Sequence, residues 1–284
     1  MQPDHALAPM WTSESLGLDT ELPSTWRAKV PIYLEQARYI IKTADSLEEF
    51  RQVIDLRSAV FIEEFAGKKG APRLDLEARD QDADFMIIQD RDTREVLASY
   101  RLLCSEFTQD FYSCSEFMID SFLETPGRKL ELSRACVRPD KRSKGIFVHL
   151  LWRGLAAYSA AIQSRYLFGC SSVQSLDLRH LVQVYQYLYQ NGCLDDRFPI
   201  QPVSGYSIIE REGLLAMILK TGAGDGENLL PPILGAYLKA GARVYGAPAF
   251  DQDFQCLDLF TVLDFDRLSE AHGRKYLRSS RNEW

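Results

Sequence analysis

Apolar residues recur along this chain with two different periods, and the changes between them mark its predicted elements. Residues 39–43 form a β-branched and aromatic run, which predicts a strand. Apolar residues spaced three and four apart over 47–61 then predict an amphipathic helix. Residues 65–82 are rich in Gly, Lys and Asp and predict a loop. The runs 85–89 and 96–104 flank an Asp-Arg-Asp turn and predict a hairpin.

The second half of the chain alternates strand and helix patterns. Strands are predicted at 129–137, 166–170 and 257–263, and helices at 146–163, 178–189 and 231–240. Residues 191–227 are rich in Gly and Pro and predict a long loop with a short helix near 210–220. Strands come first in a run and then alternate with helices, so the predicted fold class is α/β or α+β with a mixed sheet.

Composition and charge exclude several classes of protein. The chain has 284 residues, of which 46% are hydrophobic and 26% charged, as in ordinary globular proteins. Its net charge of -7 argues against a broad surface for nucleic acid, because phosphate binding needs a dense positive face. There is no secretory signal pattern and no stretch of 18 apolar residues, so we expect a cytoplasmic protein. We divide the chain into an N-terminal arm (1–36), one folded domain (37–268) with a helical insertion at about 191–240, and a basic tail (269–284).

Motifs for metals, nucleotides and serine esterases are missing from the sequence. The six cysteines form no CxxC pair and the four histidines are scattered, so we expect no metal site. The cysteines are typical of buried thiols in a reducing compartment. GxGxxG, GxxxxGK[ST] and GxSxG do not occur.

Four charged residues stand inside apolar patterns. Arg57 lies in the apolar stripe of its predicted helix, where it either meets an anion or extends along the border of the stripe to solvent. Arg101 lies in a strand and shares a half-polar face with Ser99, which is ordinary for a sheet. Glu131 and Arg134 are three residues apart in one strand, so they face opposite sides unless a β-bulge intervenes. The sequence leaves both arrangements open.

A basic loop connects the strand at 129–137 to the following helix. Its candidate binding residues are Val137, Arg138, Lys141, Arg142, Lys144 and Gly145. A strand, a basic loop and a helix N-terminus together suit a phosphate, because the free amides and the helix dipole favour an anion. The alternative is a solvated turn, and the position at a helix start favours binding.

This assembly resembles the GNAT N-acyltransferase superfamily, in which a strand ending in Val-x-Pro leads into an Arg-x-x-Gly-x-Gly/Ala loop. Arg142 and Gly145 match that loop, and Phe147 replaces its second small residue. The resemblance implies a loop that holds the phosphate of the acyl carrier. A phenylalanine at 147 is expected to crowd the pyrophosphate of coenzyme A, which favours the single phosphate of acyl carrier protein.

The chain is most similar to a narrower branch, the ornithine lipid synthase-type (hemolysin-like) N-acyltransferases. That branch is related to acyl-homoserine lactone synthases and N-acyl amino acid synthases. The resemblance covers about 38–268 and rests on 56–64, 80–82, 99–103, 131–137, 151–154, 167–172, 230–234 and 241–249. It implies a GNAT-like fold with a mixed, mostly antiparallel central sheet flanked by helices. It nominates Arg57, Asp80, Asp82, Arg101, Glu131 and Arg134 as site residues.

The resemblance also implies an activity, namely transfer of a fatty acyl group, with or without a 3-hydroxyl, from acyl carrier protein to the α-amine of an amino acid such as ornithine. In this prediction Glu131 is the general base, directly or through a water, and Arg101 and Arg134 orient it or the substrate carboxylate. Asp80 and Asp82 attract the amine or a cationic side chain. We expect no tightly bound cofactor, and acyl-CoA is the less favoured donor. Acyl carrier protein would dock on the basic loop and on the tail, which otherwise contacts anionic lipid headgroups at the inner membrane. The tail residues are Arg274, Lys275, Arg278 and Arg281.

Three alternatives stay open from the sequence. The first is an acyl-CoA-dependent acetyltransferase, which Phe147 and the long C-terminal region disfavour. The second is an acyl-homoserine lactone synthase, which the block from Pro231 onward disfavours. The third is a non-catalytic acyl-binding protein, which has no need of a base such as Glu131.

Overall fold

One nine-stranded sheet forms the centre of the computed structural model, which describes residues 22–65, 74–175, 177–209, 211–220, 226–252 and 254–268. Its strands are β1 (Tyr33–Gln36), β2 (Tyr39–Thr43), β3 (Asp84–Asp90), β4 (Val96–Cys104), β6 (Lys129–Val137), β7 (Tyr166–Val173), β8 (Leu194–Asp195), β10 (Arg243–Asp251) and β11 (Cys256–Asp264). They lie in the order β1-β2-β3-β4-β6-β7-β11-β10-β8. Only β6–β7 and β8–β10 are parallel, so the predicted mixed, mostly antiparallel sheet is confirmed.

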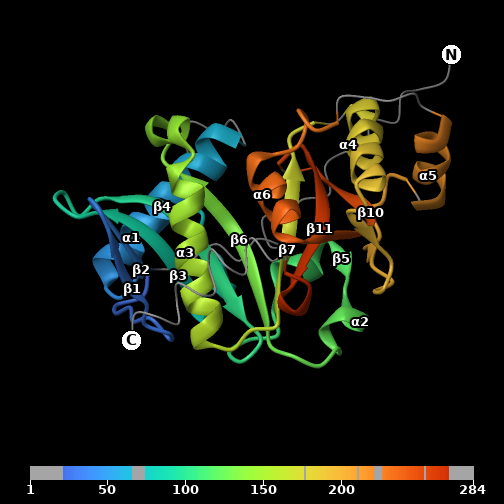
Figure 1. The fold of residues 1–284 in the computed structure, drawn as a ribbon. Helices are drawn as coiled ribbons and strands as arrows, with labels where there is room; N and C mark the ends of the chain where they lie inside the picture. The colour runs from blue at the N-terminus through green and yellow to red at the C-terminus, as the bar shows by residue number, and fades with distance from the viewer. Residues whose placement is uncertain are drawn as a thin grey trace, which may run out of the picture.

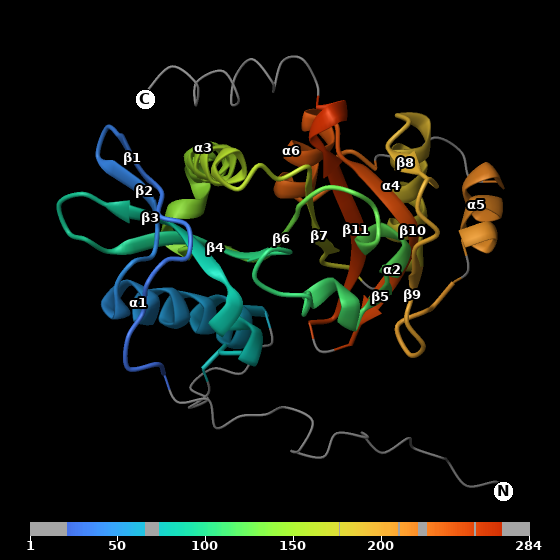
Figure 2. The same cartoon turned by 90° about the horizontal axis from the view of Figure 1, so that it is seen from below.

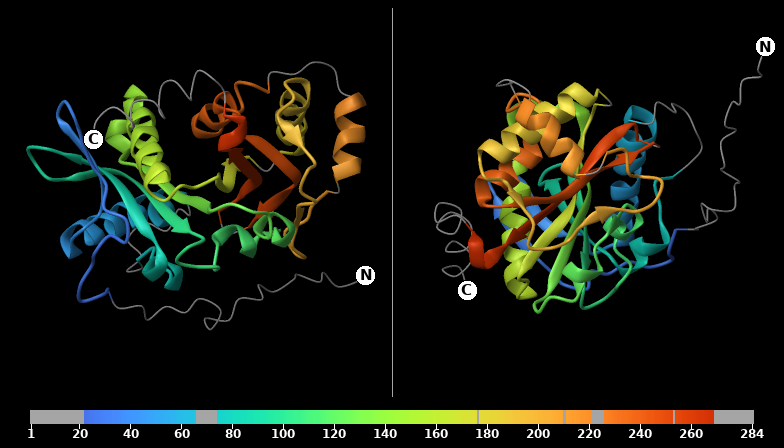
Figure 3. Two further views of the ribbon diagram at one scale, coloured as in Figure 1. Left: turned by 60° about the horizontal axis from the view of Figure 1, so that its bottom comes forward. Right: turned by 90° about the vertical axis from the view of Figure 1, so that its right-hand side faces the viewer.

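Helices cover both faces of this sheet (Figures 1 and 2). One face carries α3 (Ile146–Ala161), α6 (Pro232–Ala240) and α4 (Leu178–Gln190), and α5 (Arg211–Lys220) lies beside α4 at the β8 end (Figure 3). The other face carries α1 (Leu47–Arg57) and the 105–127 segment, with the turn η3 (Tyr112–Ser115), the short helix α2 (Asp120–Leu123) and the strand β5 (Phe117–Met118), which pairs with β9 (Gln201–Pro202). No helix in the described part of the chain is both long and apolar enough to cross a bilayer.

Local patterns predicted most of these elements, and the differences have physical causes. The helix predicted over 47–61 begins at a Ser46 cap but changes after Arg57 into a π-helical stretch, η1 (Ser58–Phe65). The strand β10 was not predicted, because Gly246 and Pro248 interrupt its apolar run.

The predicted N-terminal arm is too long. The described residues begin at Leu22, within the predicted arm. In this region β1 pairs with β2, and Trp26 stacks on Phe50 with ring centroids 4.2 Å apart. Residues 22–36 therefore belong to the folded body. Residues 1–21 and the basic tail, including its four cationic residues, lie outside the described residues.

The sheet opens between β6 and β7. These strands pair at only three positions, which end at Glu131 opposite Phe168, whereas β7 and β11 pair at eight. At the point of separation a Cβ atom on Gly169 would lie 2.4 Å from the Leu132 carbonyl oxygen, so only glycine fits there. Beyond this point β6 turns away with a β-bulge, in which Arg134 has a φ of 51° and the register with β4 shifts.

Candidate functional site

A cavity of about 290 Å³ lies where β6 and β7 separate. Its lining comes from both faces of the sheet. Leu132 and Tyr237 belong to the hydrophobic core under α3 and α6, and Phe168 belongs to the core under α1. The first half is mostly apolar and is formed by Tyr100, Leu132, Leu167, Ile233, Tyr237 and Leu263. The second half is mostly polar and includes Tyr112, Arg134, Ser172, Asp251 and Asp258. The cavity therefore suits a ligand with an apolar part and a charged part.

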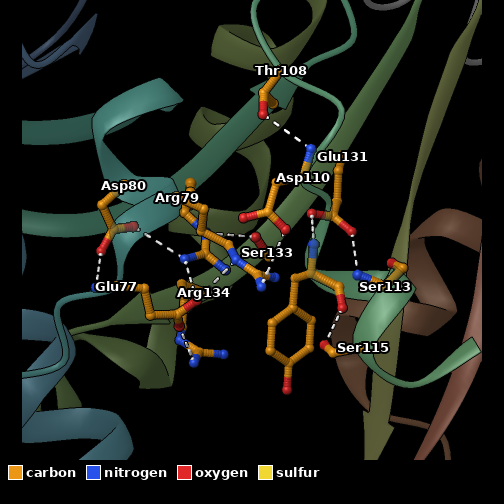
Figure 4. Close-up of polar contacts among 12 residues, drawn as sticks. Glu77, Arg79, Asp80, Thr108, Asp110, Ser113, Ser115, Glu131, Ser133 and Arg134 are labelled. Carbon is orange, nitrogen blue, oxygen red and sulfur yellow. Dashed lines mark hydrogen bonds and ion pairs between the residues drawn. The ribbon is translucent and has the colours of Figure 1, made fainter. Parts of the chain in front are cut away.

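The β-bulge decides between the two arrangements of Glu131 and Arg134 that the sequence left open. It brings Glu131 and Arg134 to the same side of the sheet, where both meet the segment that follows β4 (Figure 4). The two side chains still do not pair with each other, because Arg134 binds Asp75 and Glu77 instead.

Three arginines and three carboxylates form a compact network on the α1 side, which we call the arginine-paired cluster. Its members are Arg57, Arg101, Arg134, Asp75, Glu77 and Asp80. Arg57 donates to Asp75 at 2.9 Å and to Asp80 at 3.0 Å. Arg101 donates to the same oxygen of Asp80 at 3.0 Å and to Ser133 at 2.9 Å. Arg57 and Arg101 are fully buried, so each meets an anion rather than solvent.

Electrostatics fix the charges of this cluster. Burial alone raises the pKa of Asp75, but Arg57 and Arg134 outweigh burial and hold it well below its usual range. Burial also raises the pKa of Glu77, and Arg134 and Arg101 outweigh it and lower that pKa to about 2. The carboxylates are therefore ionised and neutralised by arginines, which leaves them little attraction for a cationic substrate.

Arg134 is the member of this cluster that lines the cavity. Its guanidinium carbon lies 4.9 Å from the centroid of the Tyr112 ring, 5.3 Å from that of Phe61 and 5.4 Å from that of Phe254. The three rings and the two acids hold the guanidinium in place at the edge of the polar half.

Glu131 does not occupy the place that the sequence prediction gave it. Its side chain is fully buried, and its oxygens accept the backbone N–H groups of Tyr112 at 2.8 Å and Ser113 at 2.7 Å (Figure 4). It is not part of the cavity lining. Glu131 therefore does not face the cavity directly, and its role as a general base stays a prediction. Its two hydrogen bonds fix the turn that carries Tyr112.

A second group of acids lies at the polar half, and we call it the cavity acid cluster. Asp251 and Asp258 line the cavity, and Glu116 lies behind them, where it interacts with Asp258 without lining the cavity itself. Asp258 is 2% exposed, stands opposite Ser172 across the β7–β11 ladder and lines the cavity. Glu116 is 1% exposed and follows the η3 turn. In the described part of the chain, no Lys, Arg or His nitrogen lies within 4.0 Å of a carboxylate oxygen of Glu116 or of Asp258, which we call the Glu116–Asp258 pair.

The pKa shifts here run opposite to those of the arginine-paired cluster. Burial first, and then the charge of Asp258, raise the pKa of Glu116 to about 9. Burial raises the pKa of Asp258 to about 6, although Ser172 and Glu116 oppose that shift by hydrogen bonding. Near neutral pH the Glu116–Asp258 pair therefore retains a proton.

The same wall of the cavity brings three groups together that could ligate a metal ion. Ligand atoms of Asp251, Cys256 and Asp258 lie within 4.8 Å of one another. Burial, together with the charges of Asp258 and Asp251, raises the pKa of the Cys256 thiol, so the thiol is protonated in the metal-free protein.

The other predicted substrate residues lie apart from the cavity lining. Asp80 is buried between Arg57 and Arg101, so the predicted contact with an amine is replaced by contacts with arginines. Asp82 is exposed at the end of the 3₁₀ turn η2 (Ala78–Asp82) and does not line the cavity.

The basic loop forms a 3₁₀ turn, η4 (Pro139–Lys144), in front of α3, and Gly145 adopts a left-handed conformation there. Arg138 and Lys141 pair with Asp140, and Arg142 pairs with Glu64 and donates to the Val137 carbonyl. The side chain of Lys144 lies outside the described residues.

Phe147 corrects an expectation about the acyl donor. Its ring is buried in the α3 core and packs edge-on against Tyr39 at 5.5 Å. It therefore points toward the sheet and does not crowd the loop amides, so it gives no reason to disfavour coenzyme A.

Several site residues were missed from the sequence. Tyr112 and Glu116 lie in a stretch without a clear period, and Asp75 and Glu77 lie in a predicted loop. Asp258 did give a signal, because it is an acid within the apolar run of β11.

Comparisons with known proteins show what this chain is similar to. Residues 56–153 match the model of the acetyltransferase (GNAT) domain. An L-ornithine N(alpha)-acyltransferase of Rhodobacter capsulatus is 29% identical over 261 residues, which cover 84% of this chain and 95% of that protein. The enzyme of the same name from Rhizobium meliloti is 29% identical over 249 residues, 83% of each chain. Among solved structures, the CoA-dependent acyl-homoserine lactone synthase BjaI covers 83% of each chain with 11% identity and a TM-score of 0.43.

Proposed function

We propose that this chain, an acyltransferase that carries a GNAT domain, moves a fatty acyl group to the α-amine of a cationic amino acid such as ornithine. The product is an N-acyl amino acid, which has one apolar and one charged part. The bond that forms joins the α-nitrogen to the acyl carbonyl carbon, and the carrier leaves as a thiol.

The observation that carries this proposal is the two-sided cavity at the β6–β7 opening. An acyl chain fits the side of Leu132, Leu167 and Leu263, while an amino acid head group fits the side of Arg134 and Asp258. The reacting carbonyl would then lie between the two halves. The names of the ornithine acyltransferases that are similar to this chain support the same acceptor.

For the donor we propose a thioester on a phosphopantetheine arm, carried by acyl carrier protein. The loop before α3 has the arrangement that suits the arm's phosphate, because the helix begins there without a side-chain cap. Acyl carrier protein is acidic, and its acids would compete with Asp140 and Glu64 for the half-buried Arg138 and Lys141 and the exposed Arg142. A 3-hydroxylated chain is part of this proposal and does not change the chemistry of transfer.

Purified full-length protein tests the proposal with ornithine and matched acyl-acyl carrier protein or acyl-CoA, followed by mass spectrometry. The expected product is N-acylornithine, formed faster from the carrier-protein thioester. The variant Arg142→Glu should raise KM for that donor and leave KM for ornithine unchanged. If no amino acid is acylated from either donor, the proposed function is wrong, and if coenzyme A is the better donor, the carrier assignment is wrong.

A further inference from the structure

We infer that the cavity acid cluster binds the side-chain ammonium of the acceptor amino acid, with Glu116 and Asp258 setting the preference for a cationic side chain. This inference rests on the proposed function and names residues that recognise the acceptor. It replaces the expected role of Asp80 and Asp82, which lie apart from the cavity lining.

The first step of the argument is charge balance. Asp75, Glu77 and Asp80 are already neutralised by three arginines. In the described part of the chain, Glu116 and Asp258 face each other without a basic side chain in salt-bridge distance. Buried carboxylates need either protons or a cation, and an ammonium ion supplies both charge and donors.

The second step is hydrogen bonding. Both carboxylate oxygens of Glu116 and Oδ1 of Asp258 are buried without a hydrogen-bond partner of normal geometry. Two carboxylates only accept hydrogen bonds, so they satisfy one another only while they share a proton. An ammonium group has three N–H donors and can serve several of these oxygens together. A neutral side chain leaves the shared proton in place and supplies no further donors, so it gains no stabilisation from these oxygens.

The third step is position. Asp258 lines the polar half of the cavity together with Arg134, and Tyr112 lies between the arginine and the acids. An amino acid with a cationic side chain has its carboxylate at one end and its side-chain ammonium at the other. The cavity offers an arginine and a carboxylate wall at separate places, which matches that distribution of charge.

The test compares ornithine with norvaline, which has the same side chain without the terminal amine. We expect the wild-type protein to prefer ornithine by about 10- to 100-fold in kcat/KM, as for a hydrogen bond to a charged group. Asp258→Asn should raise KM for ornithine more than KM for norvaline and bring the ratio of their kcat/KM values close to one, because only ornithine loses an ionic contact. Glu124→Gln, an exposed acid in the same 105–127 region as Glu116, is the control and should keep the wild-type ratio.

Calorimetry without a donor gives an independent readout in the full chain. The titratable groups that face Glu116 and Asp258 are Tyr112, Cys170, Asp251 and Cys256. An ammonium bound beside Glu116 displaces the shared proton, so ornithine should release protons to buffer and norvaline should not. Glu116→Gln should abolish this release. Because the readout needs no turnover, it also applies to a variant with little activity.

Three outcomes would overturn the inference. Equal use of ornithine and norvaline by the wild type would show that no ammonium site exists, even though acyl transfer occurs. An equal fall in kcat for both acceptors in Asp258→Asn would make Asp258 a proton acceptor instead. Loss of activity in EDTA that added metal restores would assign the carboxylates to a metal. Absence of any N-acyl product is a different result and contradicts the proposed function itself.

Discussion

Two acid clusters on the same side of the sheet show how differently carboxylates behave in one protein. Asp75 and Glu77 face arginines, and their pKa values fall below the usual range. Glu116 and Asp258 face each other, and their pKa values rise. All four side chains experience a strong effect of burial, so the difference comes from the neighbouring charge. The first cluster has its counter-ions within the fold, whereas Glu116 and Asp258 have no basic side chain in salt-bridge distance among the described residues.

The two clusters affect stability in opposite pH ranges. Glu77, with a lowered pKa of about 2, contributes stability above its ordinary value of 4.5 and loses it as the pH falls through about 2. Glu116, with a pKa raised from 4.5 to about 9, costs stability progressively as the pH rises between those values. A pH titration of unfolding therefore separates the clusters.

The largest expected effect comes from breaking the arginine-paired cluster. Arg57→Met leaves Asp75 and Asp80 buried with one cation fewer, which should cost about 3–5 kcal/mol of the free energy of unfolding. Urea denaturation measures this cost. Arg51→Met is the matched control, because Arg51 is exposed on the same helix, and it should change stability by no more than about 0.5 kcal/mol. Equal effects of the two substitutions would refute the structural role of Arg57.

A smaller effect is expected at the turn between the clusters. Glu131→Gln turns one oxygen into an N–H₂ group, which cannot accept from Tyr112 or Ser113. We expect a loss of about 1–3 kcal/mol in stability. Thermal and urea unfolding test this, with Glu124→Gln as control. A fall in activity at unchanged stability would instead support Glu131 as the base.

The smallest expected effect is on the pH dependence of stability, which distinguishes the cavity acid cluster from the arginine-paired cluster. Glu116→Gln removes a carboxyl group that ionises more readily in the unfolded chain than in the folded one. Relative to the wild type, the variant should therefore gain about 1 kcal/mol of stability between about pH 5 and about pH 6. Urea denaturation at each pH measures this difference. A constant difference across that range would mean that Glu116 is not protonated in the folded protein.

The sequence predicted well those parts of the fold that have a local cause. α3, α4 and α6 follow from the spacing of their apolar residues, and the resemblance to GNAT acyltransferases is confirmed. The bulge at Arg134 has no local cause, since it depends on the register of β6 with β4. For that reason the sequence named the bulge as an alternative but did not decide it.

Only those parts of the candidate site that leave a local pattern in the sequence were predictable. Arg57, Arg101 and Arg134 were found because charges inside apolar patterns are visible in a sequence. Their partners were not named, because the 74–82 stretch has no period that places Asp75 beside Arg57. Asp258 was visible as an acid in an apolar strand, but the sequence does not show that Glu116 lies opposite it.

The short pairing of β6 with β7 has a mechanical consequence. Three paired positions join the half of the sheet from β1 to β6 to the half from β7 to β8, while the neighbouring β7–β11 ladder has eight. A short ladder has fewer hydrogen bonds to break than a long one, so a force that separates the two halves would break this seam before the neighbouring β7–β11 ladder. The close approach of Gly169 to the Leu132 carbonyl marks the end of the seam, and the cavity begins there.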